Sequence, residues 1–219
     1  MLIQRVVVGP IQTNCYLVAR GEGAAGVVID PGDEAPRILR AIEEARMSVR
    51  YILLTHGHFD HLLALAEVRR ATGAETLIHP ADAPLLADAH SCGAAAFGMA
   101  YEPCAADRMI EDGEKIDVGE IQLATIHTPG HSPGGLSFLL RNPSKGPDTV
   151  FTGDALFCGS VGRTDLPLSS PDLLLRSIRE KLLCLPEETR ALPGHGPETT
   201  IGRELRTNPF FAYWKKGQR

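Results

Sequence analysis

Short apolar runs separated by glycine, proline and polar clusters dominate the N-terminal part of the chain, a pattern typical of strands joined by turns. Residues 6–8 and 15–19 flank a Gly9-Pro10 turn, so they predict a β-hairpin. Residues 26–30 form a third run that ends at Pro31-Gly32, and they predict a further strand. These runs indicate a sheet that begins close to the N-terminus.

Helical spacing replaces this pattern in three segments. Residues 35–47 carry an apolar face made by Ile38, Leu39, Ile42 and Ala45, and residues 62–70 show the same period. Residues 169–185 predict a third helix, with Ser170 as cap, Pro171 in the first turn and Asp172 at the positive end. Strands therefore alternate with helices, which favours an α/β fold.

Residues 80–110 follow a short predicted strand at residues 75–79 and are less regular. Proline and glycine interrupt an alanine-rich stretch, with a short helix predicted near residues 83–89. Two interpretations stay open for this excursion, a plain surface loop or a wall over a functional site.

Polar, metal-ligating side chains follow four predicted strands. The apolar run at residues 51–54 leads into a segment that holds His56, His58, Asp60 and His61. The strands at residues 121–127, 149–152 and 190–192 lead into His131, Asp154 and His195, each preceded by glycine. Because ligands beyond strand ends can converge at one sheet edge, we expect all seven to form one site.

Seven ligands exceed the four that one tetrahedral zinc ion needs, so we expect two divalent metal ions. One site takes His56, His58 and His131, and the other takes Asp60, His61 and His195, with Asp154 and a hydroxide bridging them. Imidazole and carboxylate ligands suit zinc, and also iron or manganese. Paired metals of this kind predict hydrolysis.

Composition and charge restrict the domain organisation, the partners and the cellular compartment that we expect. The 219 residues suffice for one domain, 43% of them are hydrophobic, and the net charge of -5 gives no electrostatic footprint for nucleic acid. No apolar run is long enough to cross a membrane, and the N-terminus reads as a strand rather than a signal peptide. Five cysteines without regular spacing fit a reducing cytoplasm. The oligomeric state stays open.

The motifs resemble those of the metallo-β-lactamase superfamily. His-Gly-His-Phe-Asp-His at residues 56–61, Thr-Pro-Gly-His at 128–131, Thr-Gly-Asp at 152–154 and Gly-His-Gly at 194–196 occur in the usual order of that superfamily. The resemblance covers nearly the whole chain. It implies a single hydrolase domain over residues 1–219, with an αββα sandwich of two mixed β-sheets flanked by helices.

Within the superfamily, the chain resembles the compact glyoxalase II-like hydrolases. The segments that carry this likeness are residues 13–16, 156–157, 162–165 and 207–210. The resemblance implies hydrolysis of S-lactoylglutathione, or of a related hydroxyacylglutathione thioester, with Asp60 and a metal-bound hydroxide as catalytic groups. A small-molecule thioester is therefore the expected partner, since a thiolate leaves without a dedicated acid.

Two departures from glyoxalase II concern glutathione binding. Only residues 197–207 separate the last histidine motif from Asn-Pro-Phe, so most of the helical C-terminal segment is missing. Arg163 occupies a position where the family has a basic residue, and Lys215 and Lys216 are the basic residues after Asn-Pro-Phe. Alternatively, Arg163 pairs with Asp165 to brace its loop, and the two lysines form a solvated tail.

Other functions fit the same ligands. The Gly-Arg-Thr-Asp run also resembles the persulfide dioxygenases, in which His56, His131 and Asp154 would hold one iron ion. Hydrolysis of another ester, a lactone or a β-lactam is a further alternative. A metal-binding or sensing protein without catalysis is also possible and predicts a site closed to solvent.

Overall fold

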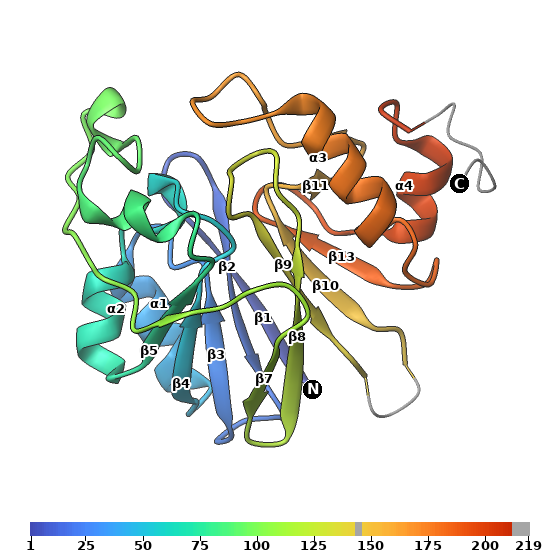
Figure 1. Ribbon diagram of the computed structural model, residues 1–219. Coiled ribbons are helices and arrows are strands. Elements are labelled where there is room, and N and C mark those ends of the chain that lie inside the picture. Colours follow the sequence, from blue (N-terminus) through green and yellow to red (C-terminus); the bar gives the residue numbers. More distant parts are fainter. Residues whose placement is uncertain (143–145, 212–219) are drawn as a thin grey trace.

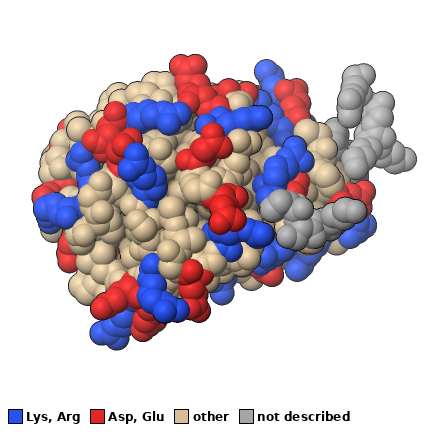
Figure 2. All heavy atoms as spheres, turned by 90° about the horizontal axis from the view of Figure 1, so that it is seen from below, with Lys and Arg blue, Asp and Glu red and all other residues tan. Residues whose placement is uncertain are grey.

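The computed structural model describes residues 1–142 and 146–211. Two six-stranded sheets pack face to face, and helices cover both outer surfaces (Figure 1). The fold is the αββα sandwich of the α/β class that the sequence predicts, with strands of both directions in each sheet. Lysine and arginine alternate with aspartate and glutamate over the lower face (Figure 2), as the weakly acidic composition leads one to expect.

The N-terminal sheet has the strand order β1-β2-β3-β4-β5-β6. Its first three strands are antiparallel, and β3 to β6 run parallel. Helices α1 and α2 cover its outer face (Figure 1). The bounds are Leu2–Val8 (β1), Thr13–Ala19 (β2), Ala25–Ile29 (β3), Ala35–Glu44 (α1), Ser48–Leu53 (β4), Leu65–Thr72 (α2), Glu75–Ile78 (β5) and Arg108–Met109 (β6).

The C-terminal sheet has the order β14-β13-β10-β9-β8-β7, and β10 and β13 are its parallel pair. Helices α3 and α4 cover its outer face, and a small hairpin of β11 and β12 lies beneath them. The bounds are Lys115–Val118 (β7), Ile121–His127 (β8), Leu136–Leu140 (β9), Thr149–Gly153 (β10), Leu156–Phe157 (β11), Ser160–Val161 (β12), Pro171–Ser177 (α3), Arg190–Pro193 (β13), Thr199–Thr200 (β14) and Ile201–Thr207 (α4).

Large apolar side chains fill the space between the sheets. Ile29 and Leu53 from the first sheet meet Phe138 and Phe151 from the second, and all four are buried. Tyr16 packs edge-on against Phe151, with ring centroids 5.2 Å apart. Burial of each such side chain contributes about 1.5–3 kcal/mol, so this core fixes how the two sheets face each other.

Element boundaries differ from the sequence-based expectation near the helices. The helix expected over residues 62–70 begins at Leu65, because Phe59–His61 forms a 3₁₀ turn (η1). The helix expected over residues 169–185 is α-helical only to Ser177 and continues as a π-helical turn, Ile178–Leu182 (η4). The expected cap is confirmed, since the Ser170 hydroxyl accepts a hydrogen bond from the Leu173 amide.

The excursion at residues 80–110 contains two short 3₁₀ helices, Ala83–Ala87 (η2) and Ala94–Phe97 (η3). It lies beside the upper edge of the N-terminal sheet, drawn in green in Figure 1. Across residues 1–142 and 146–211, no helix has the length and apolar character that a membrane span needs.

Candidate metal centre

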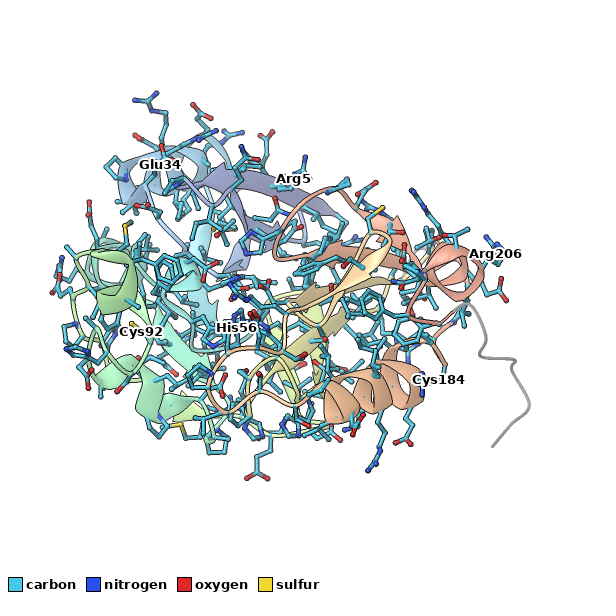
Figure 3. The ribbon with its side chains drawn as sticks, turned by 90° about the horizontal axis from the view of Figure 1, so that it is seen from above. Arg5, Glu34, His56, Cys92, Cys184 and Arg206 are labelled. Atoms are coloured by element: carbon cyan, nitrogen blue, oxygen red, sulfur yellow. The ribbon has the colours of Figure 1, made fainter. Side chains whose placement is uncertain are left out.

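The carboxyl ends of β4, β8, β10 and β13 lie at one edge of the sandwich, because the three strands of the second sheet share a direction. The loops that follow bring all seven predicted ligands together. Figure 3 shows His56 near the middle of this face, between segments from the two halves of the fold. The expected convergence of strand-end side chains is therefore what the structure shows.

The seven side chains form two groups of three around Asp154. His56, His58 and His131 are here called the first triad, and Asp60, His61 and His195 the second triad; within each, the facing atoms lie within 4.8 Å of one another. Asp154 lies between them, with its carboxylate oxygens 3.4 Å from His61 Nε2 and 3.7 Å from His131 Nε2. Each triad contains the residues that the sequence analysis assigned to one metal site, and His56, His61 and Asp154 form a further close group between the two.

Four of the histidines are oriented by hydrogen bonds on the nitrogen that faces away from the centre. Each Nδ1 donates to an oxygen, so Nε2 is the nitrogen that each of these rings presents to the cluster. The pairs are His56 with the Thr55 hydroxyl at 3.0 Å, His61 with the Asp30 carboxylate at 2.9 Å, His131 with the Arg163 carbonyl at 2.8 Å and His195 with the Ile11 carbonyl at 3.3 Å.

Buried polar atoms at the centre test whether a metal fits. Within the described residues, His56 Nε2, His61 Nε2 and Asp154 Oδ1 are buried without a hydrogen-bond partner. Leaving three such atoms unpaired in one place is costly, and a cation between them removes that cost. Imidazole nitrogens with carboxylate oxygens form the donor set of zinc, iron and manganese sites, so these residues fit divalent metal ions.

Burial determines the protonation of His56 and His58 in the first triad. It lowers the pKa of His56 well below the usual value, and the neighbouring histidines add to the effect. Burial, followed by His131, lowers the pKa of His58 to about 4. These two imidazoles are therefore neutral at pH 7, which is the form that binds a metal.

Carboxylates determine the protonation of the second triad. Burial alone would lower the pKa of His61, but Asp60, Asp154 and Asp30 outweigh it and raise that pKa well above the usual value. The same holds for His195: burial lowers its pKa, but Asp60 and Asp154 outweigh burial and raise that pKa above the usual value. Burial would raise the pKa of Asp154, but the histidines, His61 first, hold it far below the usual range.

Asp30 supports the second triad and was not among the sequence-based candidates. Its carboxylate is buried and accepts hydrogen bonds from the Thr55 amide at 2.8 Å, the Thr55 hydroxyl at 2.6 Å and His61 Nδ1. Its backbone is left-handed, with φ of 52°, a conformation that aspartate tolerates better than most residues. Its place at a strand end, like that of the ligands, was the available signal.

Asp82 supports the first triad and was also missed. Its side chain is fully buried, and its oxygens accept hydrogen bonds from the amides of Gly57 at 3.0 Å and Gly134 at 2.6 Å. Gly57 separates His56 from His58, and Gly134 belongs to the loop of His131. One carboxylate from the excursion thus joins both loops that carry the first triad.

Asn14 holds the loop of His195. Its amide donates to the Gly194 carbonyl at 2.7 Å, and its side-chain nitrogen donates to the carbonyls of Pro193 and Gly196 at 2.9 and 3.0 Å. An isolated β-bridge between Thr13 and His195 lies beside these bonds. The Thr-Asn-Cys-Tyr segment noted in the sequence is thus a structural support for the last ligand.

The predicted substrate-binding residues have different outcomes. Arg163 lies at the rim of the site, where its guanidinium forms a two-pronged ion pair with Asp165, both distances being 2.7 Å. This pairing matches the alternative in which Arg163 braces its own loop. Lys215 and Lys216 lie outside the described residues.

A cavity of about 690 Å³ opens beside both triads. Residues from the excursion, among them Leu85, Cys92 and Phe97, form one wall, and Phe157 and Leu168 belong to the opposite side. The excursion is therefore a wall over the site rather than a plain surface loop. The volume of the cavity is in the range of small-molecule binding sites, so a substrate can reach the seven clustered side chains.

Residues 8–195 match the family model of the Metallo-beta-lactamase superfamily, and the chain belongs to this superfamily. A probable metallo-hydrolase, YqgX of Bacillus subtilis, is 42% identical over 94% of this chain and 96% of its own. The hydroxyacylglutathione hydrolase GloC of Haemophilus influenzae is 37% identical over 96% of this chain and 98% of its own.

Solved structures show the same fold. The B3 metallo-beta-lactamase BLEG-1 superimposes with a TM-score of 0.89 at 35% identity, covering 96% of this chain and 100% of its own. TTHA1623 in a di-iron-bound form superimposes with a TM-score of 0.81 at 44% identity, and the match covers 94% of this chain and 99% of TTHA1623. ETHE1 from Myxococcus xanthus superimposes with a TM-score of 0.78 at 28% identity, and the match covers 95% of this chain and 84% of ETHE1.

Proposed function

We propose that this metallo-hydrolase cleaves thioesters, and that its substrate is S-lactoylglutathione or a related hydroxyacylglutathione. The observation that carries the proposal is the pair of triads around Asp154 at the floor of an open cavity. The likeness to GloC supports the choice of thioester.

In this proposal, the first triad would hold one divalent metal ion, the second triad would hold another, and Asp154, which lies between the triads, would be a ligand shared by both. Zinc is our first choice of metal; the di-iron form of TTHA1623 supports iron as an alternative, and manganese fits the same donors. When bound, such a pair supplies an activated water nucleophile and stabilises negative charge on the carbonyl oxygen.

The residues of the chain supply positioning. His195 Nε2 lies 3.1 Å from Asp60 Oδ2, so the carboxylate assigned here as catalytic is held in a fixed place. The walls on both sides orient the substrate and reduce the water around its carbonyl group. A thiolate with a pKa of about 8.5 leaves without a proton donor, and the chain need not provide one.

Glutathione binding is assigned to Arg163, Lys215 and Lys216. Arg163 can bind a carboxylate of the tripeptide through the same face of its guanidinium that now binds Asp165. Because both partners of that ion pair are exposed, a substrate carboxylate can displace Asp165 at small cost.

Thiol release from S-lactoylglutathione by zinc-loaded protein tests the proposal. We expect metal-dependent release of glutathione, followed with a thiol reagent. Protein shown to hold metal but unable to release thiol from this or other acylglutathiones would reject the thioesterase assignment.

The likeness to the ETHE1 structure favours one second candidate, a persulfide dioxygenase that holds a single iron through His56, His131 and Asp154. The test is oxygen uptake by iron-loaded protein with glutathione persulfide. Uptake together with one iron per chain would replace the thioesterase proposal.

A further inference from the structure

The cavity beside the triads is poor in basic side chains for a site that binds the carboxylates of glutathione. Among the described residues that line it, Arg163 is the only lysine or arginine, and Asp165 already binds its guanidinium. The other walls are built mainly of leucine, phenylalanine, isoleucine and proline side chains. Most of the contact that this surface offers a substrate is therefore apolar.

Three exposed apolar side chains from distant parts of the chain meet at this cavity. Ile11 is 45% exposed, Phe97 is 59% exposed and Leu168 is 71% exposed, and all three line it. They come from the β1–β2 loop, the excursion and the segment before α3. Large apolar side chains gathered around one opening are typical of a binding site.

Leu168 is also held in an unfavourable backbone conformation. Residues 166–169 form a turn closed by a hydrogen bond from the Ser169 amide to the Leu166 carbonyl at 3.2 Å, with Pro167 at its second position. The φ angle of Leu168 is 66°, where such turns usually have glycine or asparagine. Because the side chain is exposed, packing does not compensate for this strain, and strain of this kind is concentrated at functional sites.

The apolar surface is continuous with the metal-ligand loop. The Phe97 ring stacks on the Phe59 ring with centroids 4.8 Å apart, and Phe59 lies between His58 and Asp60 in the sequence. A substrate group on this surface is therefore next to the reacting centre.

We propose that this apolar surface binds the acyl group of the substrate, and that, among the acylglutathiones of the proposed function, the enzyme prefers those with a large apolar acyl group. S-lactoylglutathione, whose acyl group is small and polar, is then a weaker substrate of the same site. Ile11, Phe97 and Leu168 are the residues that set this preference. The inference rests on the proposed thioesterase function, and it identifies the acyl group as the main source of binding energy.

The test compares S-hexylglutathione with S-methylglutathione as ligands of the zinc-loaded protein, by titration calorimetry. Both are thioethers that share the tripeptide and cannot be hydrolysed, so only the apolar group differs. We expect the hexyl compound to bind at least about tenfold more tightly, because five added methylene groups leave water. Equal affinities, or no measurable binding of the hexyl compound, would overturn the inference.

Variants of Leu168 sharpen the test. Leu168→Ala should narrow the affinity ratio of the two thioethers about fivefold to tenfold, whereas Leu173→Ala should leave it unchanged. Leu173 is a matched control, since it is an exposed leucine on α3 outside the cavity lining. Leu168→Gly should narrow the ratio without lowering the Tm, because glycine relieves the positive φ. A lower Tm would assign Leu168 a structural role instead.

Hydrolysis separates the two proposals. We expect kcat/KM for S-hexanoylglutathione to exceed that for S-lactoylglutathione about tenfold or more. Hydrolysis of both at equal rates would overturn the acyl preference and leave the thioesterase proposal standing. Tight binding of the hexyl thioether without hydrolysis of either thioester would reject the reaction and retain the apolar binding surface.

Discussion

The two triads have the same number of ligands but opposite electrostatic settings. The first consists of three imidazoles, and burial keeps the pKa of His56 and His58 low. The second contains Asp60 and has Asp30 behind it, so carboxylates raise the pKa of His61 and His195. Proton competition for a metal is therefore weak at His56 and His58 and strong at His61 and His195.

The triads also differ in how they are supported. Asp30 binds the side chain of a second-triad ligand directly, whereas Asp82 binds backbone amides of the two loops that carry the first triad. One carboxylate sets the orientation and charge of a ring, and the other sets the distance between two loops. Removing each should therefore affect one site more than the other.

Replacement of Asp154 should weaken metal binding at both triads and should have the largest effect on activity. Asp154→Ala removes the residue between them, so we expect less bound metal and at least about a thousandfold lower kcat/KM. Metal analysis of the purified variant and thiol release measure these effects. Two metals retained with full activity would contradict the bridging role, and Asp117→Ala, at an exposed position on β7 outside the cavity lining, provides a control.

A reciprocal pair of variants should separate the triads. Asp30→Asn keeps the left-handed backbone but loses one of the acceptors for Thr55 and His61, so affinity at the second triad should fall about 10–100-fold. Asp82→Asn loses an acceptor for the amide of Gly57 or Gly134, so the metal affinity of the first triad should fall about tenfold.

Zinc titrations of the metal-free variants, followed by calorimetry, distinguish the two effects. Asp30→Asn should weaken the site with the stronger pH dependence, and Asp82→Asn the other. Equal weakening of both sites by either variant would show that the two supports act on the cluster as a whole.

Acidification of the wild-type protein should lower the zinc affinity of the second triad more than that of the first, and this effect should be smaller than those of the variants. The raised pKa of His61 and His195 means that protons must leave before a metal binds, and this competition grows as the pH falls. His58, with a pKa of about 4, stays neutral down to about pH 5, and burial likewise lowers the pKa of His56. Zinc binding between pH 7.5 and 5.5 should thus weaken first at the second triad, by up to about tenfold per pH unit for each displaced proton.

All seven clustered side chains could be identified from the sequence because each follows an apolar run directly. His131, Asp154 and His195 are far apart in the chain, yet strand ends at one sheet edge had to bring them together. The alternation of strands and helices predicted only a layered α/β fold, and the αββα sandwich was an implication of the resemblance to the metallo-β-lactamase superfamily.

Asp82 could not be identified in this way. Its partners are the amides of Gly57 and Gly134, and no pattern of side chains reveals a bond to the backbone of a distant loop. Strand β9, Leu136–Leu140, was also missed, although it is buried at every position like β10, which the sequence did predict. Arg163 was correctly placed beside the site, but its pairing with Asp165 depends on loop geometry.

The bonds from Thr13 and Asn14 to the loop of His195 have a consequence for the order of folding. They join the second strand of the chain to a segment about 180 residues further along, a very long-range closure. During synthesis, the first triad needs the chain only as far as Arg163, whose carbonyl orients His131, whereas the second must wait for His195 and thus for nearly the whole chain. Acquisition of a second metal ion would thus report that the two ends of the protein have found each other.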